Sequence, residues 1–433
     1  MLIGAVADDI TGASDLCLML SNAGLHTVQI MGVPAADAPM PKADAVVIAL
    51  KSRTIPAAHA VALSVDAAKC LMDAGAKQIL FKYCSTFDST DAGNIGPVTE
   101  ALMALTGAEI TIACPAFPAN RRTVYMGHLF VGGQLLSDSP MKDHPLTPMT
   151  DSNLMRVLAR QTALPVGLIS AVAVAEGVGG VQAAMADARA KGTRILVVDA
   201  TTNDDLMTLG AACKGMALVT GGSGIALGLA ANFNTAQPVA TPARMAAPAG
   251  RAVVLVGSCS AATRAQITAA KAAGMPSFAI DVAALAQGRQ TAAMIADWVI
   301  AQSGPLPPLV YSSADLSGLE QTQALLGRDA SGALVERTLA EVARQLQAAG
   351  FTRFIIAGGE TSGAVLDALA VRMLDIGPQI APGVPWTRSI GTRSIGRRSI
   401  GGPDLALALK SGNFGGPDFF VKAWDLLDPE VTA

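Results

Sequence analysis

Residues 3–15 read IGAVADDITGASD: an apolar run, two adjacent aspartates and then a helical pattern. A short apolar run of this kind is typical of a strand in a parallel sheet that helices cover on both faces. Ligands bind such sheets at the carboxyl ends of the strands. The stretch therefore predicts a strand whose end delivers Asp8 and Asp9 to a ligand site. A turn at residues 11–12 should follow, with Asp15 in the first helical turn, where its charge suits the helix dipole.

The same alternation of apolar run and helical pattern recurs along the chain. The runs expected to form strands are residues 2–7, 45–50, 78–83, 109–114, 194–200, 216–220, 252–257, 277–282, 308–313 and 353–359. Residues 233–250 break the pattern, since they hold three prolines and no periodicity, as a linker would. We therefore expect an α/β protein of two domains, residues 1–232 and 251–433, each with a mainly parallel sheet flanked by helices and with the ligand cleft between them.

Composition narrows the class of protein. At 433 residues the chain is long enough for two cores, and its 51% hydrophobic and 15% charged residues exclude a disordered protein. A formal net charge of −3 gives no general attraction to nucleic acid or to anionic membranes. The six cysteines show neither a CxxC pair nor zinc-site spacing, and no signal peptide or membrane span is evident. We expect a cytoplasmic protein with reduced cysteines and small-molecule partners; a homo-oligomer stays open.

Polar clusters also follow other expected strands of the first half, at residues 51–53, 82–90 and 120–123. An arginine fork pairs with a carboxylate, and carboxylates and hydroxyls hold a polyol, so the mixture suits a small hydroxy acid. The candidate catalytic residues are Asp8, Asp9 and Asp88, and the candidate substrate-binding residues are Thr11, Lys51, Ser52, Arg53, Lys82, Ser85 and Arg121. Each cluster also has a structural interpretation: Asp8 or Asp9 could cap the helix, and the arginine pair could be a solvated turn.

Three turns of the second half are rich in glycine and hydroxyl groups. VLVGSCSAATRAQI (254–267) and FIIAGGETSGAV (354–365) place glycines before helix starts, which is chemistry suited to a phosphate. KSGNFGG (410–416) adds a third turn, with Lys410 as a candidate phosphate partner. Neither the GxxxxGK[ST] fingerprint nor a GxGxxG after the first strand is present, and close helix packing would also explain each turn singly.

Five motifs in order carry a resemblance over essentially the whole chain: ADDITGASD, CSTFDSTDAGNIGPV, GSCSAATRAQI, GGETSG and LALALKSGNFGGPDFF. The sequence resembles the four-carbon acid sugar kinases, and within them those that act on 3-oxo-tetronate. The resemblance implies an N-terminal domain for the acid sugar, a C-terminal domain for ATP, and phosphoryl transfer to the terminal hydroxyl, giving a 3-oxo-tetronate 4-phosphate. It also implies nucleotide contacts at Ser258, Gly358, Gly359, Glu360, Thr361 and Gly412.

Phosphoryl transfer requires an aligned hydroxyl, neutralised phosphate charge and a carboxylate that can accept a proton. Asp8 and Asp9 would orient or deprotonate the sugar, and one of them could also reach a Mg²⁺ that bridges the phosphates. The catalytic base and the metal ligands stay open. The alternatives are a threonate or erythronate kinase, a nicotinamide-dependent hydroxy-acid dehydrogenase, against which the absent GxGxxG counts, and a sugar-acid-binding protein.

A five-residue unit appears three times in TRSIGTRSIGRRSIGG, residues 387–402. We expect an exposed, flexible loop here, because a longer loop costs little extra free energy to close. A tolerated surface insertion and a basic flap that attracts ATP phosphates are the two interpretations.

Overall fold

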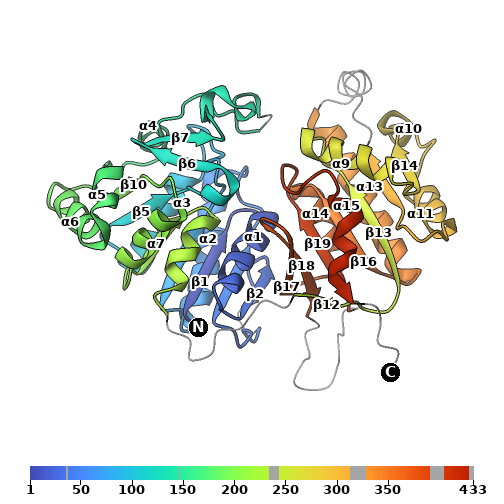
Figure 1. The fold of residues 1–433 in the computed structure, drawn as a ribbon, viewed down its shortest axis with the longest axis horizontal. Helices are drawn as coiled ribbons and strands as arrows, with labels where there is room; N and C mark the ends of the chain where they lie inside the picture. Colours follow the sequence, from blue (N-terminus) through green and yellow to red (C-terminus); the bar gives the residue numbers. More distant parts are fainter. Residues whose placement is uncertain (36–37, 145, 234–242, 313–327, 391–403, 429–433) are drawn as a thin grey trace. The chain divides into compact units, whose positions relative to one another are not determined.

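The computed structural model describes residues 1–35, 38–144, 146–233, 243–312, 328–390 and 404–428. It divides into two compact units, Met1–Ala240 and Thr241–Ala433, each built from a sheet and its helices (Figure 1). The division falls inside the proline-rich stretch expected as a linker. Part of that stretch, Met245–Ala246, nevertheless forms the short strand β12, which pairs with β20 (Leu427–Asp428). The α/β class expected from the sequence is confirmed.

The main sheet of unit 1 has the strand order β2-β3-β1-β4-β11-β5-β10-β9, and all pairs described run parallel. The strands are β1 (Ile3–Ala7), β2 (Thr27–Met31), β3 (Ala45–Ala49), β4 (Gln78–Lys82), β5 (Thr111–Cys114), β9 (Val166–Ile169), β10 (Ile195–Val198) and β11 (Leu218–Gly221). Runs such as IGAVA and AVVIA are buried throughout, so both faces of the sheet need cover. Because β1 lies between β3 and β4, the carboxyl ends of these three strands are neighbours.

Helices cover both faces of this sheet. The helices of unit 1 are α1 (Ile10–Asn22), α2 (Ala57–Asp73), α3 (Ile95–Thr106), α4 (Leu154–Ala159), α5 (Ala171–Ala175), α6 (Gly177–Ala190), α7 (Asn203–Ala212) and α8 (Ala226–Ala230), with 3₁₀ turns η2 (Leu136–Asp138), η3 (Pro140–Asp143) and η4 (Ser223–Ile225). α2 packs on α3, whereas α1 packs on α8 and α8 on α7. Right-handed crossovers account for the two layers, since the chain moves one way along the sheet through α2 and α3 and the other way through α1 and α7.

A small antiparallel sheet lies at the carboxyl edge of the main sheet of unit 1. It follows β5 through the 3₁₀ turn η1 (Pro118–Asn120) and consists of β6 (Arg122–Tyr125), β7 (His128–Val131) and β8 (Gln134–Leu135). Val124 pairs with Ala200, just past β10. The buried carboxylate of Asp199 accepts hydrogen bonds from the N–H groups of Met126 and Gly127, both at 2.9 Å. These bonds hold the hairpin over the strand ends.

Unit 2 has the strand order β14-β15-β13-β16-β19-β18-β17, parallel from β14 to β19 and antiparallel at β18 and β17. The strands are β13 (Arg251–Val256), β14 (Ser277–Ile280), β15 (Leu309–Ser312), β16 (Phe351–Ala357), β17 (Met373–Ala381), β18 (Val384–Ser389) and β19 (Ala406–Lys410). The carboxyl ends of β13, β16 and β19 are therefore neighbours.

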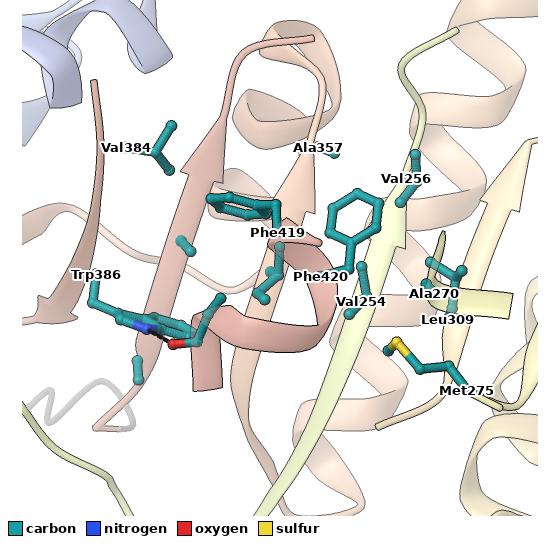
Figure 2. Packing of buried hydrophobic residues seen from close by; sticks show 14 of the residues in the cluster. Val254, Val256, Ala270, Met275, Leu309, Ala357, Val384, Trp386, Phe419 and Phe420 are labelled. Carbon is teal, nitrogen blue, oxygen red and sulfur yellow. Dashed lines mark hydrogen bonds between the residues drawn. The ribbon is translucent and has the colours of Figure 1, made fainter. Parts of the chain in front are cut away.

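The helices of unit 2 are α9 (Ala261–Ala272), α10 (Val282–Ala286), α11 (Ala292–Ala301), α13 (Arg328–Ala348), α14 (Gly359–Ala368) and α15 (Phe419–Lys422), followed by the 3₁₀ turn η5 (Ala423–Leu426). On one face of the sheet α15 packs beside α9, and Phe419 and Phe420 meet buried strand residues (Figure 2). The indole N–H of Trp386 donates to the carbonyl of Ala423 at 2.8 Å. Residues 419–426 are thereby packed into the core of unit 2.

Every apolar run expected to form a strand does so, with ends within a few residues of the expected ones. Several strands were not expected, and in some of them, such as β2, polar residues interrupt the apolar pattern. In β2 both Thr27 and Gln29 are buried, and Gln29 accepts a hydrogen bond from the hydroxyl of Ser14 at 2.8 Å. A buried partner on α1 thus allows a polar residue at a core position, which periodicity does not reveal.

Two local expectations were wrong. Residues 11–12 form no separate turn, because α1 begins at Ile10, and Asp15 consequently lies in the second helical turn. Of the TRSIG repeat, residues 387–389 belong to β18, since Thr387 and Arg388 pair with strand β19. The expectation of an exposed loop is wrong for those residues, and residues 391–402 lie outside the described part of the chain.

Candidate active site

Asp9 begins helix α1 and also faces the site. Its Oδ1 accepts hydrogen bonds from the N–H of Gly12 and from the hydroxyl of Thr11, the latter at 3.0 Å, so that Asp9 is the N-cap. Its other oxygen, Oδ2, lies 3.8 Å from Nη1 of Arg53. The capping and the functional interpretations of Asp9 therefore use different oxygens of one carboxylate.

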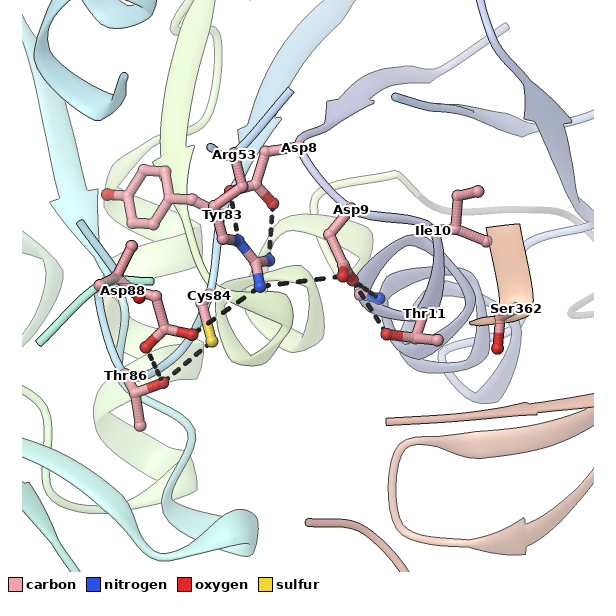
Figure 3. Close-up of polar contacts among 12 residues, drawn as sticks. Asp8, Asp9, Ile10, Thr11, Arg53, Tyr83, Cys84, Thr86, Asp88 and Ser362 are labelled. Carbon is pink, nitrogen blue, oxygen red and sulfur yellow. Dashed lines mark hydrogen bonds and ion pairs between the residues drawn. The ribbon is translucent and has the colours of Figure 1, made fainter. Parts of the chain in front are cut away.

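Arg53, which follows β3, joins three aspartates (Figure 3). Its Nε and Nη2 donate to Oδ2 and Oδ1 of Asp8 at 2.9 and 2.8 Å, a two-pronged pairing of guanidinium and carboxylate. Its Nη1 lies 3.8 Å from Oδ2 of Asp9 and 3.8 Å from Oδ2 of Asp88. The structure thus brings together Arg53 and the three candidate aspartates, Asp8, Asp9 and Asp88.

The charges of this cluster stabilise one another. Burial by itself raises the pKa of Asp9, but Arg53, the Gly12 amide, Lys82 and the Thr11 hydroxyl outweigh it and hold that pKa below its ordinary value. Burial likewise disfavours the charged Arg53, whereas Asp8 and Asp9 raise the pKa of its guanidinium well above the ordinary value. At neutral pH, Asp9 is therefore an anion and Arg53 a cation.

Asp88 is held by the loop that follows β4. The hydroxyl of Thr86 donates to Oδ1 of Asp88 at 2.6 Å, and Sγ of Cys84 lies 2.9 Å from that hydroxyl. Burial and the neighbouring Asp88 raise the pKa of Cys84 to about 11, so Cys84 is a neutral thiol. Oδ2 of Asp88 is left facing Arg53.

Asn94 holds the segment that carries Arg53. Its side-chain N–H₂ group donates to the carbonyls of Ser52, Arg53 and Ile55 at 2.6, 3.1 and 2.9 Å. Sequence reasoning assigned no role to Asn94, because an amide that binds main-chain carbonyls has no signature of its own. The only signal was its place in the motif CSTFDSTDAGNIGPV.

Lys82 is the last residue of β4, and its side chain reaches the start of α1. Its ammonium is buried and donates to the carbonyl of Tyr83 at 2.9 Å. It lies 2.9 Å from the point where a Cβ on Gly12 would stand, and Oδ1 of Asp9 is equally close to that point. Glycine at position 12 therefore leaves room for a buried cation beside the N-cap aspartate.

Asp15 faces the interior of unit 1 and does not serve the helix dipole, contrary to expectation. The hydroxyl of Ser223 donates to its Oδ2 at 2.5 Å, while its buried Oδ1 has no hydrogen-bond partner in the described segments. Burial raises the pKa of Asp15 to about 6, although Lys82, Ser223 and Arg122 each lower it. Asp15 is thus a second buried carboxylate near the cluster, one that sequence reasoning had not linked to Ser223.

The remaining candidates of unit 1 lie at different places relative to the Arg53 cluster, which Ser52 and Ser85 adjoin along the chain. Lys51 is exposed, and Ser52 is buried with its N–H donating to the carbonyl of Asp8 at 3.0 Å. Ser85 is half-buried beside Cys84, and Arg121 lines a separate pocket at the hairpin. The cluster therefore contains Arg53 and the three aspartates, with Thr11 and Lys82 around the helix start.

In unit 2 the turns after β13 and β16 come together. The N–H groups of Gly257 and Ser258 both donate to the carbonyl of Ala357, at 3.0 and 3.1 Å. Gly358 has a φ of +125°, and a Cβ there would lie 3.0 Å from Oγ1 of Thr361 and 3.2 Å from the nitrogen of Ser258. Position 358 consequently requires glycine, and the two turns pack backbone against backbone.

The turn after β19 joins them. The carbonyl of Gly412 accepts hydrogen bonds from the hydroxyls of Ser260 and Thr263 at 2.5 and 2.9 Å. A Cβ on Gly412 would lie 2.6 Å from Oγ of Ser258. The structure thereby brings Ser258, Gly358 and Gly412, three of the residues implied by the resemblance, to one edge of the sheet of unit 2.

Lys410 differs from its expected role. Its side chain is fully buried, and Nζ donates to the carbonyls of Ser411, Gly412 and Phe414 at 2.9, 3.0 and 3.1 Å and to the hydroxyl of Thr263 at 3.2 Å. The ammonium is directed at the oxygens of its own loop instead of being free for a phosphate. Burial lowers the pKa of Lys410 to about 7.

Two family models match the two halves of the chain. A sugar-binding N-terminal domain matches residues 3–229, and a nucleotide-binding C-terminal domain matches residues 253–420. The chain belongs to the four-carbon acid sugar kinase family. The resemblance carried by the five sequence motifs is confirmed.

Relatives within the family match at nearly full length. A 3-oxo-tetronate kinase of Burkholderia multivorans is 52% identical, over 99% of this chain and 97% of its own. A 3-oxo-tetronate kinase of Pseudomonas fluorescens is also 52% identical, over 98% of this chain and 96% of its own. The crystal structure of Haemophilus influenzae protein HI1011 is 41% identical with a TM-score of 0.77, and the match covers 98% of this chain and 100% of that one. The similarity to the family therefore extends over both units.

The other nucleotide candidates of this kinase lie at the start of α14. Glu360 is exposed in the first helical turn, whereas Thr361 is buried. A Cβ on Gly257 would lie 2.1 Å from Oγ1 of Thr361, so the threonine occupies the space that this glycine leaves. Thr361 thus connects the turns after β13 and β16.

Within the described ranges, no three His, Cys, Asp or Glu side chains are grouped so that they could hold a metal ion. All six cysteines are free. In the same ranges, no helix is both long enough and apolar enough to cross a bilayer.

Proposed function

We propose that the protein is an ATP-dependent kinase that phosphorylates the terminal hydroxyl of 3-oxo-tetronate. The observation that carries this proposal is the 52% identity to the Burkholderia multivorans 3-oxo-tetronate kinase along 99% of the chain. The carboxylates and cations of unit 1 suit a hydroxy acid, and the glycine turns of unit 2 suit phosphates. Residues 1–232 would hold the acid and residues 251–433 the nucleotide, with residues 233–250 as the linker.

In this reaction the terminal hydroxyl oxygen of the acid bonds to the γ-phosphorus of ATP while the bond from that phosphorus to the bridging oxygen breaks. ADP leaves, and the hydroxyl proton passes to a carboxylate or to solvent. Asp9 and Asp88 suit the carboxylate role, because Oδ2 of each faces Arg53 Nη1 at 3.8 Å and is not used by a shorter hydrogen bond in the described chain. Asp8 has both oxygens on Arg53, so its role is to hold that guanidinium.

Arg53 and Lys82 would donate hydrogen bonds to the substrate. Among the described residues, the Nη1 group of Arg53 makes only ionic contacts at 3.8 Å, and the Lys82 ammonium has one hydrogen-bond acceptor for its three protons. Both can therefore donate to hydroxyl or carbonyl oxygens of the acid. The further substrate contacts that we propose are Thr11, Lys51, Ser52, Ser85 and Arg121.

For the nucleotide, we propose contacts at Ser258, Gly358, Gly359, Glu360, Thr361 and Gly412. Gly358 is the N-cap of α14, and the first amides of a helix have no partner within the helix. Such amides bind phosphate oxygens through their partial positive charge. Lys410 supports the third of these turns from inside.

We propose Mg²⁺ as the cation that accompanies ATP. Magnesium prefers oxygen ligands and often needs only one or two carboxylates beside phosphates and water. The Oδ2 atoms of Asp9 and Asp88, which face Arg53 at 3.8 Å, fit that chemistry and would hold the ion. The ion would neutralise charge on the phosphates.

We also infer a cytoplasmic location, because all six cysteines are free and thiols persist in a reducing compartment.

The test is ADP release from Mg·ATP with the two 3-oxo-tetronate enantiomers, threonate and erythronate as acceptors. Turnover with a 3-oxo-tetronate supports the proposal. Turnover with threonate or erythronate alone would keep the kinase activity and overturn the substrate. If none of the four acids supports ADP release, the kinase proposal itself is overturned.

A further inference from the structure

A pocket lies at the hairpin of unit 1. It has a volume of about 490 Å³ and is lined by residues 120–122 and 131–134. Residues 120–122 follow the carboxyl end of β5, and the hairpin is bonded to the carboxyl end of β10 through Asp199. The pocket therefore opens at the same edge of the sheet as the Arg53 cluster.

The lining has the chemistry of an anion site. It contains two arginines and two side-chain amides and no carboxylate. Arg121 has a positive φ of 58°, and its Nη2 lies 3.1 Å from the point where a Cβ on Gly132 would stand. Its exposed guanidinium thus lies against Gly132 on the wall of the pocket.

Arg122 has a buried side-chain donor that lacks a partner among the described residues. Its Nη1 donates to the carbonyl of Asn120. Its Nε and the side-chain nitrogen of Asn120 are both buried, and neither has a hydrogen-bond partner in the residues described. Buried donors are normally paired, so two unpaired donors beside one cavity indicate an acceptor that the described part of the chain does not supply.

Arg122 is also near the residues proposed to act on the sugar. Asp15, whose pKa burial raises to about 6, is influenced by the charges of Lys82, Arg122 and Asp9. The strand order agrees with this, since only β11 separates β5, which precedes Arg122, from β4, which ends at Lys82. A small acid with its anionic end at Arg122 would extend toward Lys82 and Asp9.

We propose that this pocket binds the carboxylate of the substrate and that Arg122 determines selectivity for an acid over a neutral sugar. The inference rests on the proposed kinase function and adds to it the part of the site that recognises the anionic end. Arg122 offers Nε and Nη2, the edge that binds a carboxylate with two parallel hydrogen bonds, and the Asn120 amide adds a third donor. Arg121 adds a second, solvated positive charge.

The test compares the acid with its neutral analogue erythrulose, in which a hydroxymethyl group replaces the carboxylate of 3-oxo-tetronate. In Arg122→Gln, kcat/KM for the acid should fall about 100-fold, mostly through KM, while kcat/KM for erythrulose and KM for ATP stay within about threefold. Arg122→Lys keeps the charge but loses the forked guanidinium. Its kcat/KM for the acid should lie between those of wild type and Arg122→Gln. Arg156→Gln is the matched control, since Arg156 is an exposed arginine of the same unit paired with Asp151.

Equal losses with both sugars, or unchanged acid kinetics, would overturn the proposal. A raised KM for ATP would assign the pocket to a phosphate instead and overturn it as well. Binding of threonate, followed by calorimetry, separates this inference from the proposed function. If wild-type protein turns over no tetronate, binding that Arg122→Gln abolishes still supports the carboxylate pocket, and binding that is equal in both proteins, or absent from both, overturns it.

Discussion

The two units use a buried or partly buried cation in different ways. In unit 1, Arg53 lies among Asp8, Asp9 and Asp88, and opposite charges hold the cluster together. In unit 2, Lys410 lies among three carbonyls and a hydroxyl, so an ammonium is solvated by dipoles of its own loop. The first arrangement leaves carboxylate oxygens facing the site, whereas the second shapes a neutral turn.

The difference suits what each unit is proposed to bind. A sugar needs hydroxyl groups oriented and a proton accepted, which carboxylates do. A nucleotide brings its own negative charge, which carboxylates would repel and free main-chain amides attract. The comparison also implies different sensitivities: removing Arg53 leaves like charges together, while removing Lys410 leaves only unpaired dipoles.

The largest effect should come from Arg53→Gln. It leaves Asp8, 5% exposed, beside Asp9 and Asp88 without their shared cation, so the free energy of unfolding should fall by about 3 kcal/mol. Urea unfolding at pH 7 measures the change. Arg160→Gln, at an exposed arginine paired with Asp151 and Asp91, should leave the midpoint unchanged. Equal midpoints for the two variants would show that the three carboxylates do not depend on Arg53.

The variant Asp9→Asn distinguishes the helix-capping role of Asp9 from its proposed catalytic role. Asparagine caps helices as well as aspartate does, so stability should change little. The charge at Oδ2 is lost, and kcat should fall by about 10² or more if that oxygen orients or deprotonates the sugar. Asp66→Asn, at an exposed aspartate of α2, is the control. Near-normal turnover in Asp9→Asn would leave Asp9 with the capping role alone.

In the described chain Arg53 pairs with Asp8, Asp9 and Asp88 but not with Asp15. The free energy of unfolding should therefore depend on pH through Asp15. Its pKa is raised by burial from 3.8 to about 6, so the native state holds its proton where the unfolded chain has lost it. The resulting stability is complete below about pH 4 and is lost as pH rises through 6. The free energy of unfolding of Asp15→Asn, relative to that of wild type, should therefore rise by about 2 kcal/mol between pH 4 and pH 7. Urea unfolding at a series of pH values measures this difference. A difference that is constant with pH would contradict this.

Lys410 should make the nucleotide turn sensitive to pH, whereas Arg53 keeps its charge. Above about pH 7 the amine of Lys410 is neutral and has two protons for four acceptors. The turn should loosen, and KM for ATP should rise with pH. In Lys410→Met, KM for ATP should be about tenfold higher at pH 6.5 and should lack that rise, while the exposed Lys422→Met behaves as wild type. Parallel pH profiles for wild type and Lys410→Met would refute the role.

The strands formed by long apolar runs could be predicted from the sequence, because burial on both faces leaves a pattern that can be recognised without knowing the partner segments. The prediction that Asp8, Asp9, Arg53 and Asp88 lie at one edge followed from their places after expected parallel strands, since the carboxyl ends of such strands meet at one edge. It was correct because each residue is within a few positions of a strand end.

Side-chain roles within that edge depended on contacts between segments far apart in the chain. Asp9 divides its two oxygens between a helix cap and Arg53, and Asn94 reaches back to the carbonyls after β3. The sequence marked Lys410 as a lysine beside a glycine turn, which fits a phosphate partner as well as a buried support. Only the loop that folds back over Nζ distinguished the two.

The sequence by itself therefore determined the α/β class, the strand ends where chemistry gathers and the family to which the chain belongs. Tertiary structure decided which charges are paired, which are buried and which face a pocket, as at Arg122 and Asp15. The physical reason is that periodicity reports burial of whole segments, whereas the state of a charged group depends on the few atoms within hydrogen-bond reach of it.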